Sequence, residues 1–194
     1  MSFSEWFNRE IWGEVKIAFK PLAERKSALV FLAVLFVVAF FLGRYNKALL
    51  FIPGLTILAS LSMIYNLFVR LSLGVEFIMM ATVLCSVVYG PFVGIGVGLV
   101  SLFFAEFIST KLTYNTFVSF IGISIIGFVA SFNSGDNITM WGIFMTVLYD
   151  ILIIPGYLMT GSHPIKCFIY VATHIPFNIW VFSVIAPRVL GAMM

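Results

Sequence analysis

The sequence predicts an all-α integral membrane protein. Of its 194 residues, 62% are hydrophobic and only 10% are charged, whereas an ordinary soluble domain has about 25% charged residues. The apolar residues come in long runs, and a helix needs roughly 17–25 of them to cross the hydrocarbon core of a bilayer. Backbone polar groups in lipid must be satisfied within their own segment, so these runs are helices rather than open strands. The expected location is the cell membrane, with several passes.

The first 43 residues predict two helices ahead of the main membrane core. In residues 1–26, "SFSE" has the S-x-x-E form of a capping box. Apolar and charged side chains then alternate at helical spacing up to Pro21, which is typical of an amphipathic helix at the membrane interface. The alternative is a helix that packs on a partner protein. Residues 27–43 predict one extra hydrophobic span, because no small-x-small cleavage site follows them.

Residues 48–190 predict a six-helix membrane core. Only Gly90-Pro91 separates two of the spans, so these two form a tight hairpin. The longest polar connections have about seven residues, so no soluble domain is inserted between the spans. The expected spans are 48–69, 74–89, 91–109, 116–132, 140–159 and 167–187.

Charge and motifs exclude several classes of function. The net charge of +3 comes without a basic run, so nucleic acid is not an expected partner. Cys85 and Cys167 lie in apolar stretches with no second ligand at metal spacing, so neither a metal nor another cofactor is expected. The chain contains no H-E-x-x-H, G-x-S-x-G or G-x-x-x-x-G-K-[ST] motif. We therefore do not expect an enzyme, although one His and one Asp are the minimum for acid–base chemistry.

The glycine-rich stretch "VVYGPFVGIGVG" is a packing motif rather than a nucleotide-binding loop. A dinucleotide fingerprint needs a preceding strand and an acidic residue about 20 positions later. Gly94 and Gly98 instead share one helix face, which lets another backbone approach closely. Thr56 and Ser60 form a weaker small-residue pair of the same spacing. Such a face packs either within the chain or against another chain.

The surroundings of this stretch resemble a known family. The run "GVEFIMMATVLCSVVYGPFVGIGVGLVSLFFAEFIS" enters on an acidic residue, turns at Gly-Pro and ends on an acidic residue. It resembles the second and third helices of the S components, the substrate-binding subunits of energy-coupling-factor (ECF) vitamin transporters. "THIPFNIWVFSVIAPRVL" at 173–190 resembles their last helix, with its "ipfN" signature. The resemblance covers roughly three quarters of the chain. Rod-shape-determining proteins of the MreD type share a similar helix pattern.

Two features of the chain depart from the S components. The family has no constant need for residues 1–43, and its usual alanine-x-x-x-alanine seam is only approximated by Thr56 and Ser60. With seven spans and the N-terminus inside, eight of the 11 Lys and Arg residues lie on the cytoplasmic side, as the positive-inside rule favours. The resemblance implies the opposite orientation of the core, so the orientation stays open.

Four ionisable side chains within the spans are candidates for function: Glu76, Glu106, Asp150 and His174. A charged side chain at the bilayer centre costs about 2.5–3.5 kcal/mol on insertion scales. Glu76 and Glu106 lie near span ends, where contact with water is the alternative. Asp150 and His174 are mid-span, and they either line a cavity or only hold two helices together.

The predicted binding pocket combines polar and aromatic side chains, as ligand pockets do. His174 and Asn178 share one helix face, since they are four residues apart. The predicted pocket residues are Glu106, Tyr149, Asp150, His174, Asn178 and Trp180.

The resemblance implies a binding subunit for the uptake of a small, vitamin-like solute. Such a subunit works in the lipid bilayer with a separate transmembrane coupling subunit and ATPases. The candidate docking seam for the coupler comprises Thr56, Ser60, Gly94 and Gly98. The alternatives are a membrane scaffold of the MreD type and an intramembrane enzyme.

Overall fold

The computed structural model describes residues 46–69, 73–110 and 112–194. The predictions for residues 1–43 lie outside these ranges. Within them, all regular secondary structure is helical and no strand is present. Four helical stretches are long and apolar enough to cross a membrane: Ala48–Leu67, Pro91–Ile108, Ile138–Met159 and Pro164–Met193. The predicted all-α, multi-pass membrane protein is thereby confirmed.

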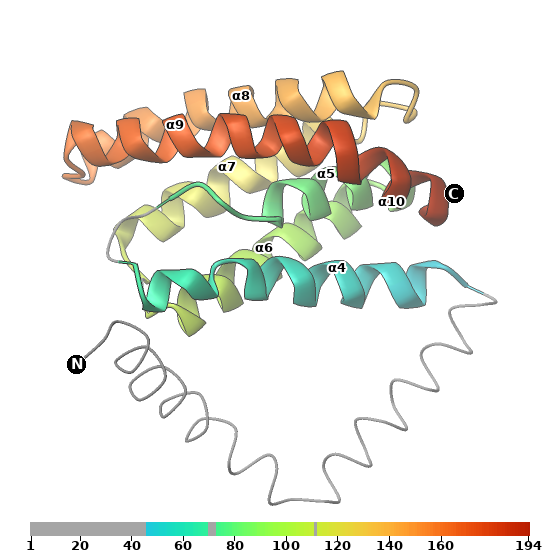
Figure 1. Cartoon of the computed structure of the whole chain (residues 1–194), viewed down its shortest axis with the longest axis horizontal. Helices are drawn as coiled ribbons and strands as arrows, with labels where there is room; N and C mark the ends of the chain where they lie inside the picture. The colour runs from blue at the N-terminus through green and yellow to red at the C-terminus, as the bar shows by residue number, and fades with distance from the viewer. Residues whose placement is uncertain (1–45, 70–72, 111) are drawn as a thin grey trace, which may run out of the picture. The chain divides into compact units, whose positions relative to one another are not determined.

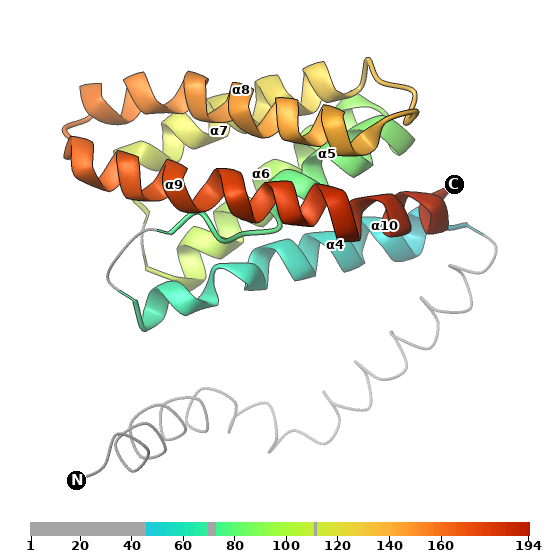
Figure 2. The ribbon, with the colours of Figure 1, turned by 45° about the horizontal axis from the view of Figure 1, so that its top comes forward.

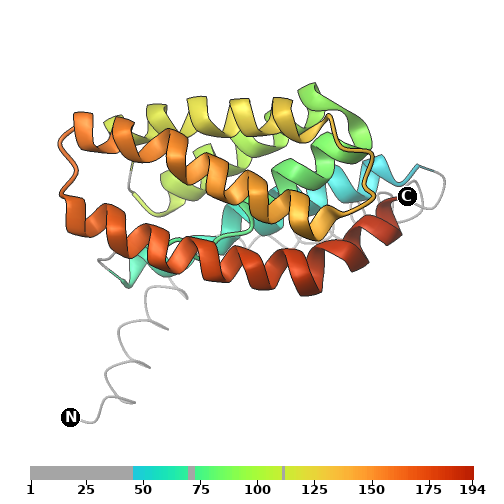
Figure 3. The ribbon, with the colours of Figure 1, turned by 90° about the horizontal axis from the view of Figure 1, so that it is seen from above.

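Six helices follow one another along the described chain, when α9, the π-helical turn after it and α10 are counted as one continuous helix (Figure 1). From α5 onward, each helix packs on the next one in the sequence. Figures 2 and 3 show α9 running beside α8 and continuing into α10. The elements are α4 (Ala48–Ser62) with the 3₁₀ turn η2 (Ile64–Leu67), α5 (Ile78–Tyr89), α6 (Pro91–Ile108), α7 (Tyr114–Ala130), α8 (Ile138–Met159) and α9 (Pro164–Trp180), which leads through a π-helical turn (Val181–Ile185) into α10 (Ala186–Met193).

The hairpin between α5 and α6 has the predicted turn. Gly90 has a φ of +92°, a conformation that glycine adopts without steric cost. Pro91 begins α6, where its missing N–H costs nothing and its fixed φ suits the first helical turn. The two helices are therefore antiparallel neighbours, joined by a single residue.

The glycine face of α6 packs against α5 of the same chain. A Cβ at Gly94 would lie 2.7 Å from the Cα of Ser86, and one at Gly98 would lie 2.5 Å from Oγ1 of Thr82. By contrast, a Cβ at Gly96 would meet nothing within 4 Å. The predicted docking seam at Gly94 and Gly98 is corrected here, because α5 already occupies that face.

The small-residue pair on α4 also makes contacts within the chain. The Ser60 hydroxyl donates to the Thr56 carbonyl at 2.7 Å, and Ser60 is buried. The Ser101 hydroxyl, from α6, reaches the same carbonyl at 3.4 Å. A docking role for Thr56 and Ser60 stays a prediction.

One predicted span begins later than expected. The sequence predicts helix from residue 74, but α5 starts at Ile78 and residues 73–76 are not helical. Its 12 residues extend about 18 Å at 1.5 Å per residue, which is shorter than the hydrocarbon core of about 30 Å. The described residues before α5, 73–77, are non-helical, and they carry part of the candidate functional site.

Candidate functional site

A buried histidine lies between two carboxylates that come from different parts of the chain. His174 on α9 is 0% exposed. Its Nδ1 lies 2.8 Å from Oδ1 of Asp150 on α8, and its Nε2 lies 3.2 Å from Oε1 of Glu76, just before α5. The predicted alternatives for Asp150 and His174 included a direct pair, and the structure brings them together. We call Glu76, His174 and Asp150 the triad.

The non-helical segment at residues 73–77 crosses α9 at very close range. A Cβ at Gly74 would lie 2.5 Å from the Cα of His174, so only glycine fits there. The Gly74 N–H donates to the Thr173 hydroxyl at 2.8 Å. This close approach is what brings Glu76 next to His174.

Side chains satisfy the backbone of this segment where helical hydrogen bonds are missing. The Tyr65 hydroxyl donates to the Leu73 carbonyl. The Phe77 N–H donates to the Ser62 hydroxyl at 3.1 Å. Irregular backbone at membrane depth is tolerated only where it is buried in protein or lines a cavity. The segment therefore belongs to a built site rather than to a lipid-facing loop.

Glu76 is fixed in place by the helix that follows it. Its carboxylate accepts hydrogen bonds from the N–H groups of Ile78 and Met79, the latter at 3.2 Å. These are unpaired donors of the first turn of α5, and the helix dipole favours a negative charge there. Glu76 thus holds one carboxylate at the start of α5 and turns it toward His174.

Asp150 and His174 lie well inside their helices, away from the helix ends. Asp150 is about 18 Å along α8 from Ile138 and about 13 Å from Met159, at 1.5 Å per residue. His174 is about 15 Å along α9 from Pro164. Because the hydrocarbon core is about 30 Å thick, both side chains lie near its centre if their helices cross it.

The triad carries one net negative charge when both of its contacts are hydrogen bonds. A neutral imidazole has a single N–H, so it can donate to only one carboxylate. One further proton, on the ring or on a carboxyl group, makes both contacts favourable and leaves the charge at −1. The second oxygen of Asp150, Oδ2, has no hydrogen-bond partner among the described residues. An uncompensated charge in this setting is costly.

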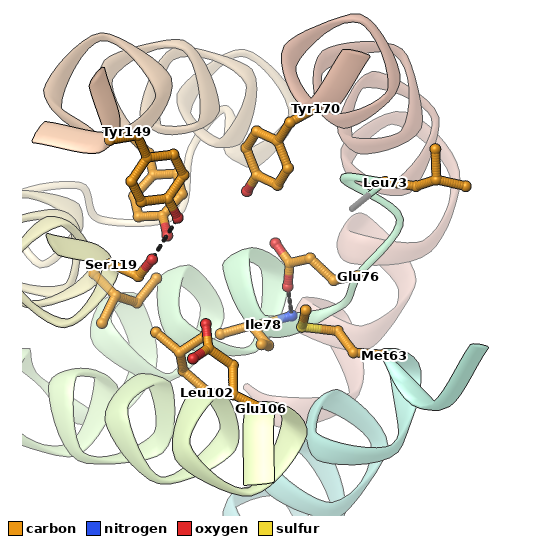
Figure 4. A pocket seen from close by; sticks show the side chains of 11 residues that line it. Met63, Leu73, Glu76, Ile78, Leu102, Glu106, Ser119, Tyr149 and Tyr170 are labelled. Carbon is orange, nitrogen blue, oxygen red and sulfur yellow. Dashed lines mark hydrogen bonds between the residues drawn. The ribbon is translucent and has the colours of Figure 1, made fainter. Parts of the chain in front are cut away.

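A small cavity opens beside the triad (Figure 4). This inner cavity has a volume of about 50 Å³. The carboxylates of Glu76 and Glu106 and the Tyr170 hydroxyl all point toward it in Figure 4. Its lining comprises Met63, Leu73, Glu76, Ile78, Leu102, Glu106, Ser119, Ile123, Tyr149, Tyr157 and Tyr170.

A second, more polar cavity adjoins the first. It has a volume of about 130 Å³ and shares five lining residues with the inner cavity: Met63, Leu73, Glu106, Tyr157 and Tyr170. Its other lining residues are Asn66, Thr113, Asn115, Ser162, Lys166 and Cys167. We call it the outer cavity, because it lies on the side of exposed Lys166 at the start of α9.

Hydrogen bonds and ring contacts hold the polar wall together. The Thr116 hydroxyl donates to the Glu106 carboxylate. The hydroxyls of Ser119 and Tyr157 are 2.5 Å apart. The Tyr170 ring stacks on His174 with centroids 5.0 Å apart. Tyr170 therefore joins the cavity wall to the triad behind it.

The predicted pocket residues fall into three positions. Glu106 and Tyr149 line the inner cavity. Asp150 and His174 line neither cavity and lie behind Glu76, while the buried Asn178 amide donates to the His174 carbonyl at 3.1 Å. Trp180 is 50% exposed and lines neither cavity.

Two functional candidates were missed from the sequence, although a signal was present. Tyr149 and Tyr157 are eight residues apart on α8, and Tyr170 precedes His174 by four on α9. These spacings place each pair on one helix face. Extending the pocket prediction along these faces would have found Tyr157 and Tyr170.

The fold and cavities define a multi-pass helical membrane protein with an ionisable site at two adjoining cavities. Comparisons with protein-family models, curated proteins and solved structures give no match. The resemblance to S components therefore rests on the sequence motifs alone, and no family is assigned.

Proposed function

We propose that this protein is a membrane-embedded binding subunit for the uptake of a small, vitamin-like solute. The observation that carries the proposal is the pair of adjoining cavities beside the triad. Ligand sites are concave and mostly apolar, with a few well-placed polar groups. The inner cavity has this make-up, since Met63, Leu102 and Ile123 line it together with two carboxylates.

The cost of the polar groups supports a binding role over a purely structural one. A scaffold of the MreD type has no need for several ionisable side chains near the bilayer centre, where each is expensive. A hydrogen-bonded pair of side chains would suffice to join two helices. Here Glu106 on α6 adds a further carboxylate to the wall of the inner cavity and is not part of the triad (Figure 4).

The state of His174 supports binding over catalysis. A general acid or base must reach the proton that it transfers. Both ring nitrogens of His174 already face carboxylates, and the side chain is fully enclosed. We therefore assign the triad to building and charging the site, with no chemical step.

The source of energy for uptake follows from the resemblance. The S components work with a separate transmembrane coupling subunit and ATPases, and we propose the same arrangement here. This chain has no phosphate-binding loop of its own. We assign no docking seam on α6, because its glycine face is filled from within the chain.

Small molecules that stay bound through purification test the proposal. The full chain is purified in mild detergent, denatured, and its released solutes are identified by mass spectrometry. Met63→Trp fills a position that lines both cavities, whereas Phe104→Trp changes a side chain on α6 that is 47% exposed. We expect one solute at near-stoichiometric amounts in the wild type and in Phe104→Trp, and its loss in Met63→Trp.

Equal traces of the same solutes in all three proteins would contradict a binding role. A resident solute, once identified, also provides the substrate for uptake assays in cells. In those assays, transport should depend on the ATPases.

A further inference from the structure

We infer that the cavities select a small organic cation: a protonated amine or a cationic ring. This inference rests on the proposed binding function and deepens it by naming the class of ligand. It depends on the charge, the aromatic side chains and the volume of the site.

Two carboxyl groups, and no base among the described residues, line the inner cavity. Glu76 brings the net charge of the triad to the cavity wall, and Glu106 faces it from α6 (Figure 4). Among the described lining residues of both cavities, Lys166 is the single base, and it is exposed at the outer cavity. A buried negative charge is costly unless a cation or a proton compensates it. Glu76 is the one member of the triad that lines the cavity, so a bound cation compensates the charge there.

The aromatic lining also favours a cation. Tyr149, Tyr157 and Tyr170 all line the inner cavity. A cation within about 6 Å of an aromatic ring is attracted to the face of the ring, and aromatic cages that bind ammonium groups use this effect. Tyrosine rings beside two carboxylates thus combine apolar contact with attraction for positive charge. An organic anion would gain only the apolar contact.

The volumes limit the ligand to about one ring. The inner and outer cavities measure about 50 and 130 Å³. An apolar cavity of about 150 Å³ holds one benzene molecule. The ammonium group would lie in the inner cavity between Glu76 and Glu106, and the remainder of the ligand would extend past Tyr157 and Tyr170 into the outer one.

Matched probes that differ in charge test the inference. Benzylamine is a cation at neutral pH, benzyl alcohol is its neutral isostere, and benzoate is an anion of similar size. In a Cys85→Ser background, Cys167 is the single cysteine of the full chain and lines the outer cavity. The rate of its alkylation by N-ethylmaleimide reports occupancy of the site.

We expect benzylamine to slow alkylation of Cys167 at least fivefold and in a saturable way. Benzyl alcohol should require at least tenfold higher concentration, and benzoate should have no effect. The melting temperature of the wild-type protein, measured with the same three probes, gives a second readout, because a ligand that binds the folded state raises it.

A matched pair of variants locates the effect. Glu106→Gln removes a carboxylate of the cavity wall, and we expect it to weaken protection by benzylamine at least tenfold. Asp136→Asn makes the same chemical change in the exposed turn before α8 and should leave protection unchanged. Glu106 is the better target than Glu76, because Glu76 also caps α5 and its loss threatens folding.

Two results overturn the inference while leaving the binding function intact. One is protection by benzoate or benzyl alcohol that equals protection by benzylamine. The other is a neutral or anionic resident solute in the mass spectra. Absence of any effect of benzylamine on Cys167 and on melting also overturns the cation inference. The binding function then still stands or falls by the resident solute alone.

Discussion

The two ends of α5 differ in how tightly they are packed. From Thr82 toward its C-terminal end, α5 packs against the glycine face of α6 so closely that a methyl group added to Gly94 or Gly98 would overlap Ser86 or Thr82. At its N-terminal end, the chain is not helical, Glu76 caps the helix, and a cavity remains open. Both ends lie in one hydrophobic stretch of sequence. The comparison indicates that specific contacts maintain the cavity and that loose packing does not account for it.

The difference has a physical cause in the partners of the backbone. Small residues on α6 let the C-terminal half of α5 gain packing contacts, which drive helix association in lipid where the hydrophobic effect between helices is absent. At the N-terminal end, hydrogen bonds from Tyr65, Ser62 and Thr173 replace the helical ones. Polar partners thus fix the walls that surround the empty space.

Breaking the triad should have the largest effect on stability. His174→Gln leaves two buried carboxylates without a shared donor, and removing one partner of a buried pair costs about 3–5 kcal/mol. We expect a comparable loss for Asp150→Asn and no additivity in the double variant, because the two side chains are in contact. Thermal unfolding of the wild type, the two single variants and the double variant in detergent gives this double-mutant cycle. Additive losses would show that the two side chains do not act together.

Overfilling the packed end of α5 should have the next largest effect. Gly94→Leu forces a side chain into Ser86, and overpacking typically costs about 1–3 kcal/mol, occasionally more. Gly96→Leu is the matched control, since nothing lies within 4 Å of a Cβ at that position. We expect the melting temperature to fall only in the first variant. Equal melting temperatures would mean that α5 and α6 do not pack through this face.

A single hydroxyl of the cavity wall should have the smallest effect. Tyr157→Phe removes the hydrogen bond to Ser119, and such bonds contribute about 0.5–1.5 kcal/mol. Tyr114→Phe, at a side chain that is 80% exposed, is the control. We expect a lower melting temperature and weaker solute retention in Tyr157→Phe alone. If both variants changed by the same amount, the Tyr157 hydroxyl would have no specific role in the site.

Much of the fold was predictable, because lipid leaves the chain few choices. Apolar runs between polar turns predicted the six helices, and Gly90-Pro91 predicted the position of the hairpin turn to within one residue. The start of α5 was missed because residues 74–77 are as apolar as a helix, apart from Glu76. Hydropathy does not distinguish a helix from extended chain that is buried by its neighbours.

The candidate site was only partly predictable. The Asp150–His174 contact was anticipated as one of two alternatives, since both residues are mid-span on successive helices. Trp180 was included because it is close to Asn178 in the sequence. Two residues along a helix rotate the side chain by about 200°, however, and Trp180 points away from the buried face. The contact between Glu76, the third member of the triad, and His174 joins residues that are 98 positions apart, and no local sequence pattern reveals it.

The measurement that tests the central claim most directly is solute retention against stability in Glu106→Gln and Asp150→Asn, purified side by side. Glu106 lines both cavities, whereas Asp150 lies behind them. We predict that Glu106→Gln loses the resident solute. Its melting temperature should stay within a few degrees of that of wild-type protein from which the solute has been washed out, whereas Asp150→Asn should melt at a far lower temperature. If Glu106→Gln instead keeps its full complement of solute and loses stability as Asp150→Asn does, the carboxylates serve only to hold helices together and the cavity is not a binding site.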